Sequence, residues 1–112
     1  MSAGERGSGS ILVIAILAAM LSLLSLFVPL AAVLLTRHSV ATAADASALA
    51  AADVASGLLP GSPCPEAATV AAANHVQIDR CDVDGAVVTV TASTVVLGFR
   101  VAMTATAGPP DT

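Results

Sequence analysis

Two cysteines and two histidines are the side chains of this sequence best suited to chemistry at a fixed site. They are Cys64, Cys81, His38 and His75. All four are zinc-ligand types, but their spacings of 26, 11 and 6 residues contain no close ligand pair of the kind that zinc sites use. A disulfide that closes a small domain outside the cytoplasm suits an even cysteine count better. We therefore predict a disulfide between the cysteines, two surface histidines and no metal ion.

Other arrangements that could support catalysis or binding are weak. Asp79, Asp82 and Asp84 alternate near a turn and could attract a cation, but they supply too few oxygens without a calcium-binding loop. The serines lack a Gly-x-Ser-x-Gly motif, and the glycines near the N-terminus precede no Gly-Lys-Ser/Thr of a phosphate loop. We predict no catalytic residue, no cofactor and no small-molecule substrate, so the chain is not expected to be an enzyme.

A long apolar segment dominates the N-terminal third of the chain. Ile11 to Leu35 contain no charged residue and follow a short N-terminal tail, residues 1–10. As a helix these 25 residues would extend roughly 37 Å, which exceeds the ~30 Å hydrocarbon core of a bilayer. We predict a transmembrane helix over residues 11–35, with Pro29 as the expected position of a kink.

Composition restricts what the remainder can be. The chain has 112 residues, a net charge of -4 and no Trp, Tyr or Lys, and its four arginines are scattered. Nucleic acid is therefore not an expected partner, because phosphate binding requires a clustered basic surface. A small domain built from Ala, Val and Leu buries little area per residue, so the predicted disulfide would stabilise it usefully, by about 3 kcal/mol.

Two interpretations of the apolar segment remain open. A signal peptide usually has an apolar region of 7 to 15 residues, so the length favours a retained membrane helix. The small residues Ala41-Thr42-Ala43 nevertheless resemble a signal peptidase site, and cleavage there would release residues 44–112. Arg6 and Arg37 lie on opposite sides of the segment, so positive charge favours neither orientation. The cysteine pair and the short N-terminal tail instead favour a cytoplasmic N-terminus and an extracytoplasmic C-terminal region.

The helix is predicted to continue beyond the membrane over residues 36–57. This segment is rich in alanine and contains neither Gly nor Pro before Gly57. Small residues at Ala44, Ala48, Ala51 and Ala55 would let another helix backbone approach closely, so they are candidate helix-packing residues in an assembled complex. The alternative is alanine-rich composition without a specific contact. A polar stripe lies beside them, at His38, Thr42, Asp45, Asp53 and Ser56.

Residues 58–107 are predicted to form a short helix followed by a small antiparallel β-meander. A loop rich in proline ends at Pro65, which suits a first helical position, and helix formers follow up to Asn74. Apolar and polar residues then alternate in three runs. These begin near Val76, at Ala86 and after Gly98, with Asp84-Gly85 as a hairpin signal. Residues 108–112 form the predicted flexible tail, and the whole is an α+β membrane-anchored fold.

The N-terminal half resembles a known family. Arg6-Gly7-Ser8, the apolar segment, Arg37 and the block from Ala43 to Ala52 are similar to the N-terminal module of TadE/TadG-like proteins, which are pilin-like components of tight-adherence (Flp-type) pilus assembly. The short outer part and the lack of lysine resemble the small actinobacterial members found near secretion genes. The resemblance implies a pseudopilin-like membrane subunit that contacts other pilin-like or secretion subunits. The alternative is a small secreted or surface-released binding protein exported by its apolar segment.

One feature of processed prepilins is missing. Those proteins carry a glycine before the apolar segment and a glutamate five residues after that glycine. Counted from Gly7 or Gly9 that position is Leu12 or Ile14, and Glu5 lies outside the segment. An acid within a membrane span is costly and therefore informative, so its absence favours an assembly or minor component over a polymerising subunit and leaves N-terminal processing open.

Overall fold

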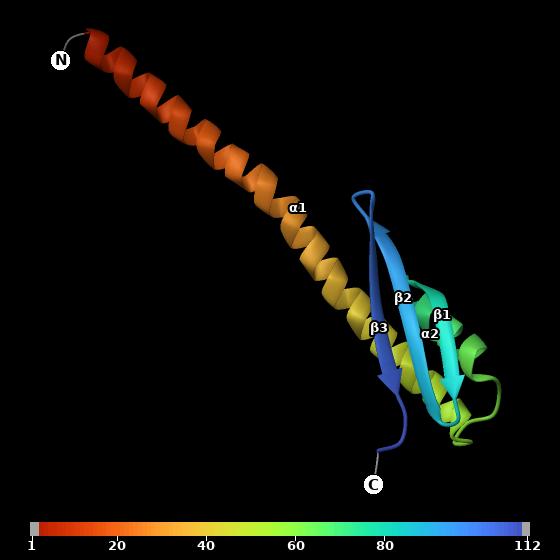
Figure 1. Ribbon diagram of the computed structural model, residues 1–112. Coiled ribbons are helices and arrows are strands. Elements are labelled where there is room, and N and C mark those ends of the chain that lie inside the picture. The colour runs from red at the N-terminus through yellow and green to blue at the C-terminus, as the bar shows by residue number, and fades with distance from the viewer. Residues whose placement is uncertain (1–2, 111–112) are drawn as a thin grey trace. The chain divides into compact units, whose positions relative to one another are not determined.

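The computed structural model describes residues 3–110, and the side chains of residues 7–110. Within this range the elements are two helices, α1 (Ala3–Ala55) and α2 (Pro63–Ala73), and three strands, β1 (Gln77–Asp84), β2 (Val87–Val96) and β3 (Phe99–Ala107) (Figure 1). The predicted α+β class is confirmed. The chain divides into two compact units, one ending at Ala32 and one beginning at Val33, and α1 contributes to both.

The first unit is the N-terminal part of α1. Its helix begins at Ala3, so most of the predicted tail is helical. An 18-residue window of this helix has a mean hydropathy of 3.0 and is 0% buried, which suits a membrane span. Ser22 and Ser25 donate their hydroxyls to the carbonyls of Ala18 and Leu21, both at 2.8 Å. These polar groups are therefore satisfied inside the helix, as an apolar solvent requires.

Pro29 does not end the helix. It lies inside α1 and has no N–H to donate to the carbonyl of Ser25, one turn earlier. Helix α1 continues for 26 residues beyond it, to Ala55. Transmembrane helices tolerate such a proline more readily than soluble ones, which agrees with its place in the apolar segment.

The second unit begins with the rest of α1, which is a core element. Val40, Ala44, Ala48 and Ala51 are each 0% exposed. They belong to one apolar cluster with residues of α2 and of all three strands. Ser47 is also buried, and its hydroxyl has no hydrogen-bond partner among the described residues. Small side chains on this face allow the helix backbone to lie close to the sheet.

Both helices end in a Schellman motif, which directs the chain back toward the domain. At the end of α1, Gly57 has φ +83, Leu58 donates its N–H to the carbonyl of Asp53, and Gly57 donates to Val54. At the end of α2, His75 takes the corresponding position with φ +61. There Val76 donates to the carbonyl of Ala71, and the two side chains are buried together in the core. The last carbonyls of each helix are thus satisfied by the turn that follows.

The three strands form an antiparallel sheet in the order β1-β2-β3. The first hairpin closes through Gly85 and Ala86, of which only Gly85 has positive φ, at +63, as in a type II′ turn. Asp84 is therefore the last strand residue and not a turn residue, although the Asp84-Gly85 signal located the hairpin. The second hairpin closes through Leu97 and Gly98, with φ values of +52 and +80 that fit a type I′ turn.

One face of the sheet carries the core. Val88, Val90 and Ala92 of β2 are 0% exposed, and Val101 and Ala105 of β3 lie beside them. The C-terminal part of α1 and helix α2 lie on the same side of the sheet (Figure 1), and Ala67 and Ala71 of α2 complete the cluster. The domain therefore has two layers, with two helices over one sheet face.

A bulky residue in the alanine face of α1 tests this packing. We expect Ala48→Leu to lower the free energy of unfolding of the domain by about 1–3 kcal/mol, because the added methylenes have no space between helix and sheet. Thr42→Leu is the matched control, since Thr42 is exposed on the same helix. Urea-gradient pulse proteolysis of the full chain in detergent measures both. Equal midpoints for Ala48→Leu and wild type would contradict the assigned core.

Candidate interaction surface

A β-bulge in β1 brings the two cysteines together. Ile78 pairs with Ala92 and Arg80 with Thr91, so Asp79 is an extra residue without a partner. In a regular strand Ile78 and Arg80 would share a face. The bulge instead places Cys81 on the core face with Ile78 and turns Arg80 to the opposite face. Regular alternation from Ile78 would have placed Arg80 on the core face, and the bulge is the reason that it lies on the other face.

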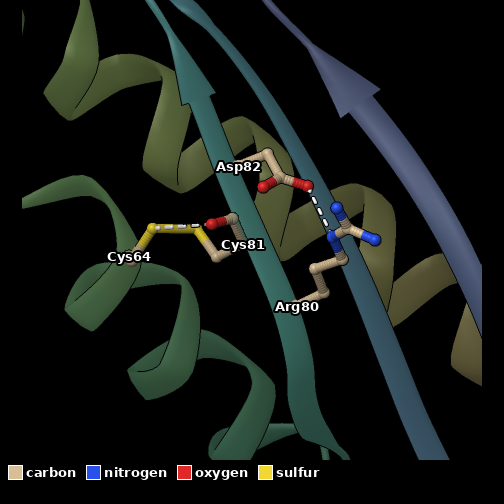
Figure 2. Close-up of a disulfide and its surroundings, with 4 residues drawn as sticks. All are labelled: Cys64, Arg80, Cys81 and Asp82. Atoms are coloured by element: carbon tan, nitrogen blue, oxygen red, sulfur yellow. Dashed lines mark hydrogen bonds and ion pairs between the residues drawn. A yellow bond between two sulfur atoms is a disulfide. The ribbon is translucent and has the colours of Figure 1, made fainter.

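The disulfide joins α2 to β1. Cys64 and Cys81 are bonded, with their Cα atoms 5.9 Å apart, and Figure 2 shows the bond crossing from the helix to the strand. The Cys64 sulfur also lies 3.7 Å from the carbonyl oxygen of Cys81. Helix α2 begins at Pro63, two residues earlier than predicted, so Cys64 lies in its first turn and not before it. The bond fastens the start of α2 to the middle of β1. It also occupies both thiols, which removes them as ligands for zinc.

The second face of the sheet carries no helix among the described residues and is rich in threonine. Thr89 faces Thr106 and Thr91 faces Thr104 on neighbouring strands, with hydroxyl oxygens 3.0 Å apart in each pair. Such cross-strand pairs stabilise the sheet, and their hydroxyl groups make this surface polar. We name this surface, from Thr89, Thr91, Thr104 and Thr106, the threonine face.

Charged pairs border the threonine face. Arg80 donates its Nε–H to Asp82 at 2.9 Å (Figure 2), and Arg100 of β3 donates to the bulge residue Asp79. The Ser93 hydroxyl, the Arg100 guanidinium and the Gln77 amide lower the pKa of the Asp79 carboxyl below its ordinary value, 3.8, and their combined effect exceeds that of partial burial, which raises it. The bulge is thus held by a carboxylate that stays ionised at neutral pH.

The two edges of the sheet differ in their protection. Edge strand β1 carries the bulge, the disulfide and three aspartates, features that discourage pairing with another strand. Edge strand β3 is nine residues long and has no bulge and no proline, and its single charged residue is Arg100. Within residues 3–110 no strand pairs with its outer side. The threonine face and the β3 edge together form the surface of the domain most open to a partner.

The candidate helix-packing residues are not on the exposed surface of the domain. Ala44, Ala48 and Ala51 are completely buried against the chain's own domain, and Ala55 is partly buried beside them. They do permit close packing, but the element that approaches them is the sheet of the same chain. The hypothesis that they contact another subunit is corrected on this ground, because buried side chains leave no surface for one.

The polar stripe predicted for the same helix is exposed. His38, Thr42, Asp45, Asp53 and Ser56 all face solvent, as does Leu49, which interrupts them. Among the described residues, no three His, Cys, Asp or Glu side chains form a group that could hold a metal ion. His38 lies on α1, whereas His75 ends α2, where it serves as a helix cap. The stripe is thus the solvent side of a helix whose other side is core.

The part of the chain that matches a known protein family lies within α1. Residues 7–54 match a family model described as "Putative Flp pilus-assembly TadE/G-like". The match supports the TadE/G-like family. It covers the apolar segment and continues through the core part of α1, ending one residue before the helix does. No curated protein and no solved structure matches the chain. The sheet, with its threonine face, lies outside the matched residues.

The features missed by the sequence-based site prediction are the bulge, the threonine face and the free β3 edge. Alternation of Val and Thr in residues 88–91 did signal a strand with one wet face. The position of the bulge had no such signal, because the bulge is defined by the pairing of Ile78 and Arg80 with neighbouring residues of β2.

Reduction of the disulfide should weaken the domain. The bond links residues 17 positions apart, so its loss should lower the free energy of unfolding by about 3 kcal/mol. The urea midpoint of the full chain in detergent, with and without reductant, measures this. A Cys64→Ala/Cys81→Ala variant is the control and should not respond to reductant. Full thiol labelling of both cysteines in unreduced, denatured protein would contradict the pairing.

The Asp79 carboxylate should make stability depend on pH. Its pKa is lower in the folded than in the unfolded chain, so its contribution is present above the unfolded value and is lost as pH falls through the folded one. We expect Asp79→Asn to be less stable than wild type at pH 7, and this difference to shrink near pH 2. Asp84→Asn, at the exposed hairpin, serves as control in urea titrations. An undiminished difference at low pH would contradict the assigned role.

Proposed function

We propose that this chain is a single-pass, pilin-like membrane subunit that acts in assembly of a Flp pilus or a related envelope secretion system. Its N-terminus is cytoplasmic, its domain is extracytoplasmic, and its role is structural and not enzymatic. Other pilin-like or secretion subunits are its partners. The observation that carries the proposal is the extent of the TadE/G-like match, residues 7–54, which contains both the apolar span and the helix that forms the domain core.

The physical role follows from this shared helix. The apolar part of α1 holds the chain in the bilayer, while residues 40–52 pack against the apolar face of the sheet. Because those alanines are buried, subunit contacts must use another surface. The threonine face and the β3 edge suit this purpose, since they combine hydroxyl groups with an unpaired strand of low charge.

The proposal favours retention over release. Cleavage after Ala43 would remove Val40 and Ala43, both buried, from the core of the released domain. It would also cut a segment that is helical in the folded chain, whereas proteolytic sites concentrate at poorly ordered segments. A soluble extracellular species beginning near Ala44 would support the secreted alternative and contradict the proposal.

Site-specific photocrosslinking in the native cell envelope tests the assigned surface. We expect a benzoylphenylalanine at Thr104, on the threonine face, to form crosslinks to other envelope proteins. The matched control is the same group at Thr69, which is exposed on α2. Equal yields from the two positions would contradict the assignment of the threonine face, and an alkali-extractable chain would contradict the membrane subunit itself.

A further inference from the structure

The tip of the β2–β3 hairpin is apolar and exposed. Val95, Leu97 and Phe99 are 68%, 60% and 66% exposed, respectively. Leu97 has φ +52 at a turn position where Gly, Asn or Asp is favoured. A leucine there strains the backbone without adding to the core. Local strain of this kind is commonly retained where the side chain has a role outside the fold. We name these three residues the hairpin tip.

The opposite end of β3 locates the hairpin tip along α1. Gly108 and Pro109, just beyond β3, line a shallow pocket with Ala52, Ser56 and Leu58 at the end of α1. From Gly108 back to Phe99 an extended strand covers about 30 Å. At about 1.5 Å per residue, roughly 15 to 20 helical residues cover the same rise, depending on the angle between strand and helix. Within this unit β3 runs beside α1 in the same direction (Figure 1), so the tip is level with residues 33–38.

Packing supports this placement. Val33, the first residue of the domain unit, contacts the buried core, and so does Val96, the neighbour of Leu97 in the hairpin. Val33 is thus the first residue of α1 that contacts the core, and Val96 is the last residue of β2 that does so. Val87, at the other end of β2, lies beside the Gly85 turn.

Residues 33–38 are also where the apolar segment ends. Leu34 and Leu35 are 55% and 71% exposed, and the exposed Arg37 follows them. About 20 apolar residues cross the hydrocarbon core, so the ends of the 25-residue segment reach the headgroup region. If α1 spans the membrane as proposed above, the hairpin tip lies at the same depth.

We propose that the hairpin tip inserts into the bilayer interface as a second membrane contact beside α1. This inference rests on the proposed membrane retention of α1. The occupant is lipid and not another protein, because three side chains at a tip form far too small an area for a stable protein interface, whereas they are level with Leu34 and Leu35 at the end of the apolar segment. The second contact holds the domain against the bilayer and limits rotation of the domain, together with α1, about the helix axis.

Tryptophan fluorescence provides a direct test, because the sequence contains no Trp or Tyr. The full-length Phe99→Trp variant is reconstituted in liposomes, with Val87→Trp as the matched control at the far end of the sheet. We expect phosphatidylcholine brominated near the headgroup to quench Phe99→Trp at least about threefold more than Val87→Trp, and acrylamide to quench them in the opposite order. Leu97→Asn, which suits the turn better, should reduce the lipid quenching of Phe99→Trp.

The other outcomes overturn the inference. Quenching of Phe99→Trp by acrylamide to the same extent as the control would place the tip in water. Protection from both quenchers would show burial against protein. Liposome flotation of the same samples separates this failure from that of the proposed function, because a chain that does not float lacks the membrane anchor altogether.

Discussion

The packing of α1 against its own sheet is the interaction on which the domain depends. A three-stranded sheet is stable only when its apolar face is covered, and residues 40–52 of α1 supply most of that cover. Alanine and serine on the helix, opposite valines on the strands, let the two backbones approach in a core with no buried aromatic side chain. Helix α2 covers the remainder and is fastened by the disulfide.

One helix thus serves in two environments. Its first part is leucine- and isoleucine-rich on all sides and exposed throughout, as a lipid-facing helix is. Its second part, in contrast, is amphipathic, with small apolar residues toward the sheet and charged or hydroxyl residues toward water. The helix continues between them without a break. The match to the TadE/G-like family model covers both parts.

Much of this architecture was predictable from the sequence, and the remainder depended on tertiary contacts. The uninterrupted apolar segment, the alternation in residues 87–96 and the two cysteines predicted the long helix, the meander and the small stapled domain. The direction in which Cys81 points was not predictable from alternation, since the bulge at Asp79 is defined only by pairing with β2. The alanine face of α1 was predicted to pack closely, but sequence alone did not distinguish a neighbouring subunit from the chain's own sheet, because either accepts small residues. Helix α2 began earlier than predicted because Pro63, like Pro65, suits a first turn.

The central claim is that the outer half of α1 and the sheet form one cooperative unit. Amide hydrogen exchange of the full chain in lipid nanodiscs tests it most directly. The account predicts that amides of residues 40–52 exchange as slowly as those of Val88 and Val90, and that both groups lose protection together when the disulfide is reduced. Rapid exchange of residues 40–52 while the strands stay protected would contradict it, because the helix would then not be part of the core.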